Sequence, residues 1–261
     1  MYNFEFEKPG SVADAVTALA SEEAQALGGG QTLIPTLKQR LNAPAKLVSL
    51  TGIADMRGVS SDGGTVTVGG ATTHATVAAE AGAYPALAAL AGHIGDPAVR
   101  NRGTIGGSLA NNDPAACYPA AVLASGATVV TNTREIAADD FFDGMFSTAL
   151  HDGEIITAVR FPVPQAASYR KFLQPASRFA LTGVFVAKHA DGVRVAVTGA
   201  SEEGVFRWSE AEVALGKEFR PDALMDLKIN PSNMIGDLHG TKEYRAHLVG
   251  VMTKRAVAAA G

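Results

Sequence analysis

The order of hydrophobic and polar residues predicts alternating strands and helices over the first 165 residues. Period-two alternation or a short apolar run marks each strand, and apolar residues at helical spacing mark each helix. The expected strands lie at 2–8, 24–27, 46–50, 127–131 and 153–164, and a hairpin with a turn at 62–64 lies within 56–70. The expected helices lie at 11–20, at 32–41 with an interruption at Pro35, at 75–92 with a break near Pro85, and after Pro114. This mixture predicts an α+β protein.

The pattern changes after Pro162 and Pro164, which we expect to mark a domain boundary. Alternating runs at 170–174, 183–189 and 193–199 predict an antiparallel sheet, and helices are expected at 209–216 and 241–260. We therefore expect an N-terminal domain at 1–165 and a smaller C-terminal domain at 166–261. The N-terminal domain divides into subdomains of about 1–52 and 53–165.

Composition narrows the class of protein. The 261 residues are 47% hydrophobic and 18% charged with a net charge of −4, as in a soluble globular protein, and no basic patch for nucleic acid or an acidic membrane is present. No secretory signal and no apolar run of membrane-spanning length is found, so a membrane span is not expected. The single cysteine, Cys117, excludes an internal disulfide and fits a reducing cytoplasm.

Two glycine clusters carry the candidate chemistry. Residues 28–32 read Gly-Gly-Gly-Gln-Thr and residues 103–108 read Gly-Thr-Ile-Gly-Gly-Ser. Successive glycines let backbone N–H groups converge on phosphate oxygens. The first cluster is not the dinucleotide fingerprint, because the third glycine of that pattern would fall at Leu33, and no Gly-Lys-Ser/Thr loop follows. One cluster alone is more often an ordinary turn, but two together favour a nucleotide cofactor held by its diphosphate.

Other polar residues leave their roles open. Asp113 before Pro114 fits a helix cap, and its carboxylate can equally accept hydrogen bonds from sugar hydroxyls. His74 either faces a cofactor or is a satisfied loop histidine, which is the commoner case, and Cys117 fits a buried helix residue. The six histidines lack metal-ligand spacing and no nucleophile motif occurs, so we expect neither a metal site nor a catalytic side chain.

The sequence also resembles a known protein family over nearly the whole chain. The stretches "GGGQTLIPTLKQRL" and "IGDPAVRNRGTIGGSLANNDPAACYPAAVLA" closely resemble the FAD-binding medium subunit of the molybdenum hydroxylases, the xanthine dehydrogenase and aerobic carbon monoxide dehydrogenase family. Further similarity lies in "GGATTH", "FFDGMFSTALHDGEIITAVRFP" and "KFLQPASRFALTGV". The resemblance implies a two-subdomain FAD-binding fold of the vanillyl-alcohol oxidase type, followed by a smaller C-terminal α+β flavoprotein domain.

The resemblance also implies which residues hold the cofactor. The first pyrophosphate loop matches Gly28, Gly29, Gly30, Gln31 and Thr32, and the second matches Asn101, Gly103, Thr104, Ile105, Gly106, Gly107 and Ser108, with Asp113 after it. Ile155 or Ile156 would border the flavin ring. A lysine at the start of the C-terminal domain commonly approaches the flavin in this family. Lys171 is available here, whereas Leu173 occupies a neighbouring position that is often lysine.

The function implied by the resemblance is electron transfer. Electrons from a large molybdopterin subunit would cross 2Fe–2S clusters in a small subunit and reduce FAD on this chain, which passes them to an external acceptor. The complex is expected to be a dimer of heterotrimers. The chain's single cysteine cannot hold an extra 4Fe–4S cluster. Two alternatives remain: a stand-alone FAD-dependent oxidoreductase, which would be active by itself, and a non-redox nucleotide-binding assembly module, which would not be reducible.

Overall fold

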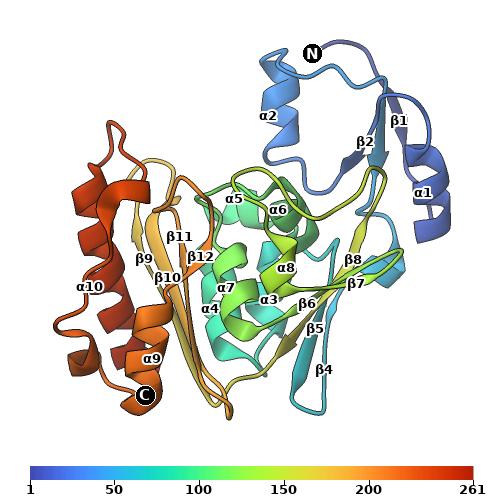
Figure 1. Cartoon of the computed structure of the whole chain (residues 1–261). Helices are drawn as coiled ribbons and strands as arrows, with labels where there is room; N and C mark the ends of the chain where they lie inside the picture. The colour runs from blue at the N-terminus through green and yellow to red at the C-terminus, as the bar shows by residue number, and fades with distance from the viewer. Residues whose placement is uncertain (261) are drawn as a thin grey trace.

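The computed structural model describes residues 1–260, which form three sheets with helices packed on each (Figure 1). The three sheets follow one another along the chain, and together they confirm a mixed α and β architecture. No helix within residues 1–260 is both long and apolar enough to cross a membrane.

The first sheet is small and parallel, in the order β1-β3-β2. Its elements are β1 (Glu5–Glu7), α1 (Val12–Leu19), β2 (Ala24–Leu27), α2 (Leu33–Lys38) and β3 (Lys46–Ser49). The predicted cap of α1 is confirmed, because Ser11 Oγ accepts a hydrogen bond from the Asp14 N–H at 3.1 Å. The predicted interruption at Pro35 is wrong: this proline lies in the first turn of α2, where a missing N–H costs no intrahelical bond.

The second sheet is antiparallel, in the order β4-β5-β8-β6-β7. Its strands are β4 (Val59–Asp62), β5 (Thr65–Gly69), β6 (Thr128–Thr131), β7 (Glu135–Ala137) and β8 (Ile156–Pro162), and η1 (Ala54–Met56) precedes them. The helices that accompany it are α3 (His74–Glu80), α4 (Pro85–Gly92), α5 (Pro97–Arg100), α6 (Ile105–Asn111), α7 (Tyr118–Ser125) and α8 (Ala138–Phe141). Every residue of α7 is buried, so this helix forms the centre of the largest hydrophobic core.

The third sheet is antiparallel, in the order β12-β11-β10-β9. It comprises β9 (Ala166–Leu173), β10 (Ala180–Lys188), β11 (Val193–Thr198) and β12 (Phe206–Arg207), followed by α9 (Ser209–Lys217), η2 (Pro221–Leu224), η3 (Pro231–Asn233) and α10 (Lys242–Ala260). Helix α10 covers the outer face and α7 lies against the inner face (Figure 1). All but the last residue of β10 are therefore buried.

Most predicted elements are confirmed, including the hairpin at 62–64, the helix break near Pro85 and the C-terminal sheet and helices. The segment 97–111 differs from expectation. No helix is predicted there, yet it forms α5 and α6. Asp96 and Thr104 cap these two helices through their side chains, and the cap bonds offset the low helix propensity of glycine.

Candidate cofactor site

A cavity of about 540 Å³ lies where the three sheets meet. Its walls come from the segment after β2, from the middle of the chain around α3, α5 and α6, and from Lys171 and residues 177–179 of the C-terminal part. This volume is within the range of small-molecule and cofactor sites. The two glycine clusters, 75 positions apart in the sequence at 28 and 103, lie together in its wall.

The two glycine loops pack backbone against backbone. A Cβ on Gly29 would overlap the carbonyl oxygen of Arg102, and a Cβ on Gly28 would lie 2.7 Å from Thr104 Oγ1. Gly30 has a φ of +72°, a conformation that other residues rarely adopt. These glycines therefore contribute to packing: only residues without side chains let the two loops approach so closely.

The second loop uses its own N–H groups inside the protein. The N–H of Ile105 donates to Thr72 O at 3.1 Å, that of Gly106 to Gly70 O at 2.8 Å, and that of Gly107 to Thr104 Oγ1 at 3.2 Å. By contrast, within residues 1–260 the N–H groups of residues 29–32 have no protein acceptor. The free backbone donors for an anion are therefore those of the first loop.

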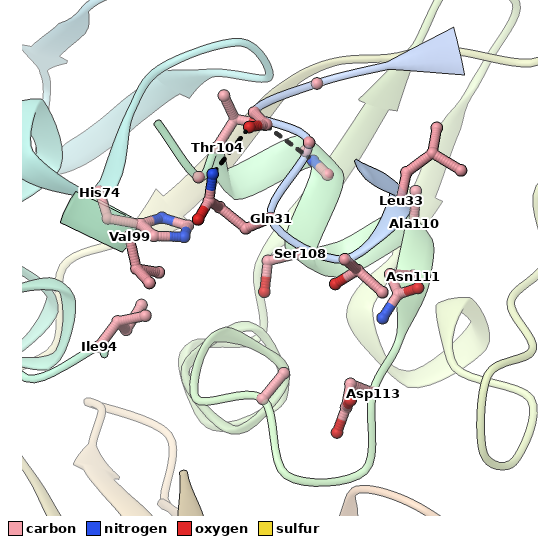
Figure 2. Close-up of a pocket in the computed structure, with 18 of the residues that line it drawn as sticks. Gln31, Leu33, His74, Ile94, Val99, Thr104, Ser108, Ala110, Asn111 and Asp113 are labelled. Carbon is pink, nitrogen blue, oxygen red and sulfur yellow. Dashed lines mark hydrogen bonds between the residues drawn. The ribbon is translucent and has the colours of Figure 1, made fainter. Parts of the chain in front are cut away.

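On the side of the cavity next to the end of α6, the lining includes three polar side chains. Figure 2 shows Ser108, Asn111 and Asp113 on this side. Asp113 Oδ1 accepts a hydrogen bond from the Ala115 N–H at 2.8 Å, which closes a turn. The predicted helix cap at Asp113 is wrong, because α7 begins at Tyr118. The turn uses Oδ1 of this carboxylate and not Oδ2.

Lys171 joins the C-terminal part to the middle of the chain. Its ammonium group donates to the carbonyl of His93 at 2.8 Å and to that of Arg178 at 2.7 Å, and lies 3.6 Å from Cys117 Sγ. Cys117 is buried as expected, although it precedes α7 rather than lying within it. Lys171 lines the cavity, whereas Leu173 on the same strand is exposed and is not among the lining residues.

A buried carboxylate fixes the wall beside Ile155 and Ile156. The Glu154 side chain is 2% exposed and forms an ion pair with Arg134 at 3.0 Å. It also accepts hydrogen bonds from Thr131 Oγ1 at 2.6 Å and from the His151 N–H at 2.8 Å. The Arg134 hydrogen bond holds the pKa of Glu154 well below its usual value, and the threonine and backbone donors add to this effect.

His74 lies on the opposite side of the glycine loops from Asp113, next to Val99 and Ile94 (Figure 2). Its side chain is buried, and burial followed by the nearby Arg100 charge lowers the pKa of His74 to about 4. The expectation of a satisfied loop histidine is wrong, because Nδ1 has no hydrogen-bond partner within residues 1–260 and the residue begins α3.

Most of the site residues predicted from the sequence come together around the cavity. The lining includes Gly28, Gly29, Gly30, Gln31, Thr32, Gly103, Thr104, Gly106, Gly107, Ser108, Asp113, Ile156 and Lys171. The lining within residues 1–260 does not include Asn101, which is exposed at the end of α5, or Ile105, which is buried in the core. Lining residues that the sequence did not indicate as site residues include Ile94, Val99, Asn111, Glu154 and Phe179. For the first three, the only signal in the sequence is their position close to the second glycine cluster.

The cavity fits a dinucleotide. The N–H groups of residues 29–32, which have no acceptor within residues 1–260, lie in the wall between a side that carries Asp113 and a side that carries His74 and Ile94. A diphosphate between two ring-bearing halves has this same division.

Comparisons with known proteins agree with this geometry. Residues 2–164 match the family described as "FAD binding domain in molybdopterin dehydrogenase". The chain is 33% identical to the carbon monoxide dehydrogenase medium chain of Afipia carboxidovorans and 34% identical to the nicotine 6-hydroxylase medium subunit of Paenarthrobacter nicotinovorans, with 98% of this chain and 96% of each relative covered.

Solved structures give the same result. The chain superposes on a subunit of the reconstituted CO dehydrogenase from Oligotropha carboxidovorans with a TM-score of 0.89 at 30% identity, covering 99% of this chain and 98% of that one. Its TM-score against a chain of quinoline 2-oxidoreductase from Pseudomonas putida 86 is 0.87 at 28% identity, covering 99% and 97%. Because the family matches more than half of the chain and the cavity fits a dinucleotide, this chain belongs to the FAD-binding medium subunits of the molybdenum hydroxylases.

Proposed function

We propose that the chain is the FAD-carrying electron-transfer subunit of a molybdenum-containing hydroxylase or dehydrogenase complex. The observation that carries this proposal is the cavity, in whose wall two glycine loops remote in sequence meet, and where the N–H groups of residues 29–32 have no acceptor within residues 1–260. When bound, FAD supplies redox chemistry in one-electron and two-electron steps, which links single-electron 2Fe–2S clusters to an external acceptor.

The residues of the chain bind and orient the cofactor in this proposal. Backbone N–H groups of Gly29, Gly30, Gln31 and Thr32 hold the diphosphate, since no protein acceptor within residues 1–260 uses them. From the second loop, Gly103, Thr104, Gly106 and Gly107 line the cavity, and Ser108 adds its hydroxyl group. Asp113 accepts hydrogen bonds from ribityl or ribose hydroxyls.

Ile156 and Lys171 border the flavin ring in the proposal. The Glu154 hydrogen bonds keep the segment that contains Ile156 fixed, and the two carbonyl contacts keep the Lys171 ammonium close to the cavity. A fixed positive charge near a flavin favours its reduced, more negative form. We assign no catalytic acid, base or metal ligand to the chain.

The proposed assembly contains a small 2Fe–2S subunit and a large molybdopterin subunit, as a dimer of heterotrimers in the cytoplasm. The medium-chain and medium-subunit names of the relatives support a multi-subunit complex. We also propose that residues 1–165 form two subdomains, about 1–52 and 53–165, of the vanillyl-alcohol oxidase type, and that 166–261 form the C-terminal flavoprotein domain. The separate sheets of these three parts support this division.

Anaerobic mixing tests the electron-transfer role. The proposed small 2Fe–2S subunit is reduced with dithionite, desalted and mixed with the oxidised flavoprotein, and the visible spectrum is followed. We expect the flavin band to bleach as the cluster reoxidises. A flavin that stays oxidised would support a non-redox assembly module instead, and substrate turnover by this chain alone would support a stand-alone oxidoreductase.

A further inference from the structure

The segment 113–117 is the part of the cavity wall that joins the end of α6 to the start of α7. Four of its five residues line the cavity: Asp113, Ala115, Ala116 and Cys117. Two local bonds shape it into a turn, because the Ala115 N–H donates to Asp113 Oδ1 at 2.8 Å and the Ala116 N–H donates to Asp113 O at 2.9 Å. These bonds give the turn its shape but do not fix its position beside the cavity.

The end of β11, in the C-terminal part of the chain, fixes the position of this turn. Thr198 is fully buried, and its Oγ1 lies 2.9 Å from Pro114 O and 2.7 Å from Ala116 O. The single hydroxyl hydrogen is therefore shared between two carbonyls of the turn. The Gly199 N–H also donates to Pro114 O, at 2.7 Å. Two adjacent residues of the third sheet thus hold the backbone of the turn.

The strand that carries Thr198 is itself well placed for this task. Arg194 lies on the same face of β11, since side chains alternate along a strand, and its Nε donates to Leu123 O in the last turn of α7 at 2.8 Å. Beyond the strand, Arg245 of α10 donates to Gly199 O at 2.7 Å. One fixed strand therefore holds α7 near its end and the turn before its start (Figure 1).

Asp113 is the residue of the turn whose orientation bears on binding. Its Oδ2 is not used by the turn, and Figure 2 shows the side chain among other residues that line the cavity. A carboxylate oxygen accepts a hydroxyl hydrogen only when the two oxygens lie about 2.5–3.0 Å apart. A small displacement of the turn would therefore remove a hydrogen bond between Asp113 and a bound ligand.

We propose that Thr198 is a positioning residue for the cofactor. Through Pro114 O and Ala116 O, its hydroxyl group holds Asp113 in the orientation in which the carboxylate accepts a hydrogen bond from an FAD hydroxyl. This inference rests on the proposed function, because it takes FAD as the ligand and Asp113 as its acceptor. It gives the C-terminal part a contribution to FAD affinity from a side chain that is not among the residues lining the cavity within 1–260.

Calorimetric titration of the apoprotein with FAD measures this contribution. The variants are Thr198→Val, Thr198→Ser and the control Thr182→Val. Valine matches threonine in shape, and Thr182 is equally buried on the neighbouring strand, where its hydroxyl donates to Leu181 O at 2.9 Å. We expect Thr198→Val to weaken FAD binding by about tenfold, and the other two variants to bind FAD within about twofold of the wild type.

A double-mutant cycle tests whether Thr198 acts through Asp113. In Asp113→Asn the amide oxygen can still accept from the Ala115 N–H, whereas the amide nitrogen cannot accept a hydroxyl hydrogen. We expect the further loss caused by Thr198→Val to fall below about twofold in this background, because both residues serve one hydrogen bond. An undiminished loss in the Asp113→Asn background, or an equal loss of FAD affinity in Thr182→Val, would overturn the proposal.

A second readout needs no variant that might misfold. In the wild type, FAD should slow hydrogen exchange at the Gly199 N–H, which donates to the turn. It should slow exchange less at the His189 N–H, which donates to Gly192 O at 2.7 Å in the connection between β10 and β11. Equal slowing at both amides would overturn the proposal. Wild-type protein that binds no FAD would instead overturn the proposed function, so the two failures are distinguishable.

Discussion

At the scale of single residues, the absence of side chains shapes the site. The glycines at 28, 29 and 103 allow two backbone loops to touch, and both loops line the cavity. Glycine here serves close packing between loops, and the free N–H groups of the first loop are a consequence of that arrangement.

Adding one methyl group should therefore separate the loops. In Gly29→Ala the new Cβ would overlap Arg102 O, and we expect a loss of about 1–3 kcal/mol of stability together with at least about tenfold weaker FAD binding. Urea unfolding and FAD titration measure the two effects. The control Gly250→Ala meets no atom within 4 Å inside α10 and should stabilise the protein by about 0.5–1 kcal/mol. Unchanged FAD affinity in Gly29→Ala would contradict the loop contact.

Glu154→Gln tests the buried ion pair beside Ile155. Because the folded pKa of Glu154 lies below its usual 4.5, its stabilising effect is complete above about pH 4.5 and declines as the pH falls toward the folded value. We expect Glu154→Gln to cost about 2 kcal/mol at neutral pH and the gap from wild type to narrow under acid conditions. Urea unfolding at several pH values measures this. A gap that stays constant down to about pH 3, or an equal loss in the exposed control Glu22→Gln, would refute the role of the charge.

At the scale of elements, α10 is fastened to the C-terminal sheet by one buried arginine. Arg245 is 4% exposed, and its Nη1 donates to Leu181 O at 2.8 Å and to Gly199 O at 2.7 Å, while Nη2 binds Asp237 at 2.7 Å. These bonds join the start of α10 to β10 and to the end of β11. The helix also makes apolar contacts, through residues such as Val249, Met252 and Ala256.

Replacement of this arginine should loosen the helix. We expect Arg245→Met to reduce the free energy of unfolding by about 2–3 kcal/mol, because two carbonyls and a carboxylate lose their donor. Hydrogen exchange should accelerate in α10 and β10 before it does so in the first sheet. Arg255→Met, on the exposed face of the same helix, should change stability by no more than about 0.5 kcal/mol. An equal effect of both variants would show that burial of Arg245 is not decisive.

At the scale of the whole molecule, the cavity depends on three parts of the chain at once. The segment after β2, the middle sheet with its helices, and Lys171 from β9 all contribute to its wall. A ligand in such a position stabilises every part that it contacts, by an amount set by its concentration relative to its Kd.

FAD should therefore raise the melting temperature of the full chain. At about 100 times its Kd, FAD should add about 2.7 kcal/mol, or a shift of about 5–10 °C for a protein of this size. Calorimetry of the apoprotein with and without FAD measures the shift. Lys171→Met, which loses the carbonyl contacts to His93 and Arg178, should show a smaller shift. The control Lys254→Met, at a half-buried position of α10 outside the cavity lining, should show the full shift. A shift that Lys171→Met leaves intact would argue against its proposed place beside the flavin.

The sequence predicted the elements well because most are encoded locally. Period-two runs, the Ser11 cap and the turn at Gly63 and Gly64 each specify their own conformation, and the structure has them where expected. The helices of 97–111 were missed because glycine lowers helix propensity, whereas the caps at Asp96 and Thr104 and the tertiary bonds of Gly106 to Gly70 override it.

The site could be predicted only in part, for a similar reason. The glycine loops can be recognised in the sequence. The contact between them links positions far apart, however, and no spacing rule predicts that Gly29 contacts Arg102. Nor could the sequence show that the N–H groups of the second loop are already bonded, or that His74 is buried with an unpartnered nitrogen. These facts depend on tertiary packing.

The most direct test of the account is to identify and reduce the flavin of the purified chain. Acid release followed by chromatography should yield one FAD per chain, and anaerobic dithionite should bleach its visible band reversibly on return of air. If the folded chain, verified by circular dichroism, contained no flavin and took up none from excess FAD, the claim that its glycine-walled cavity holds this cofactor would be contradicted.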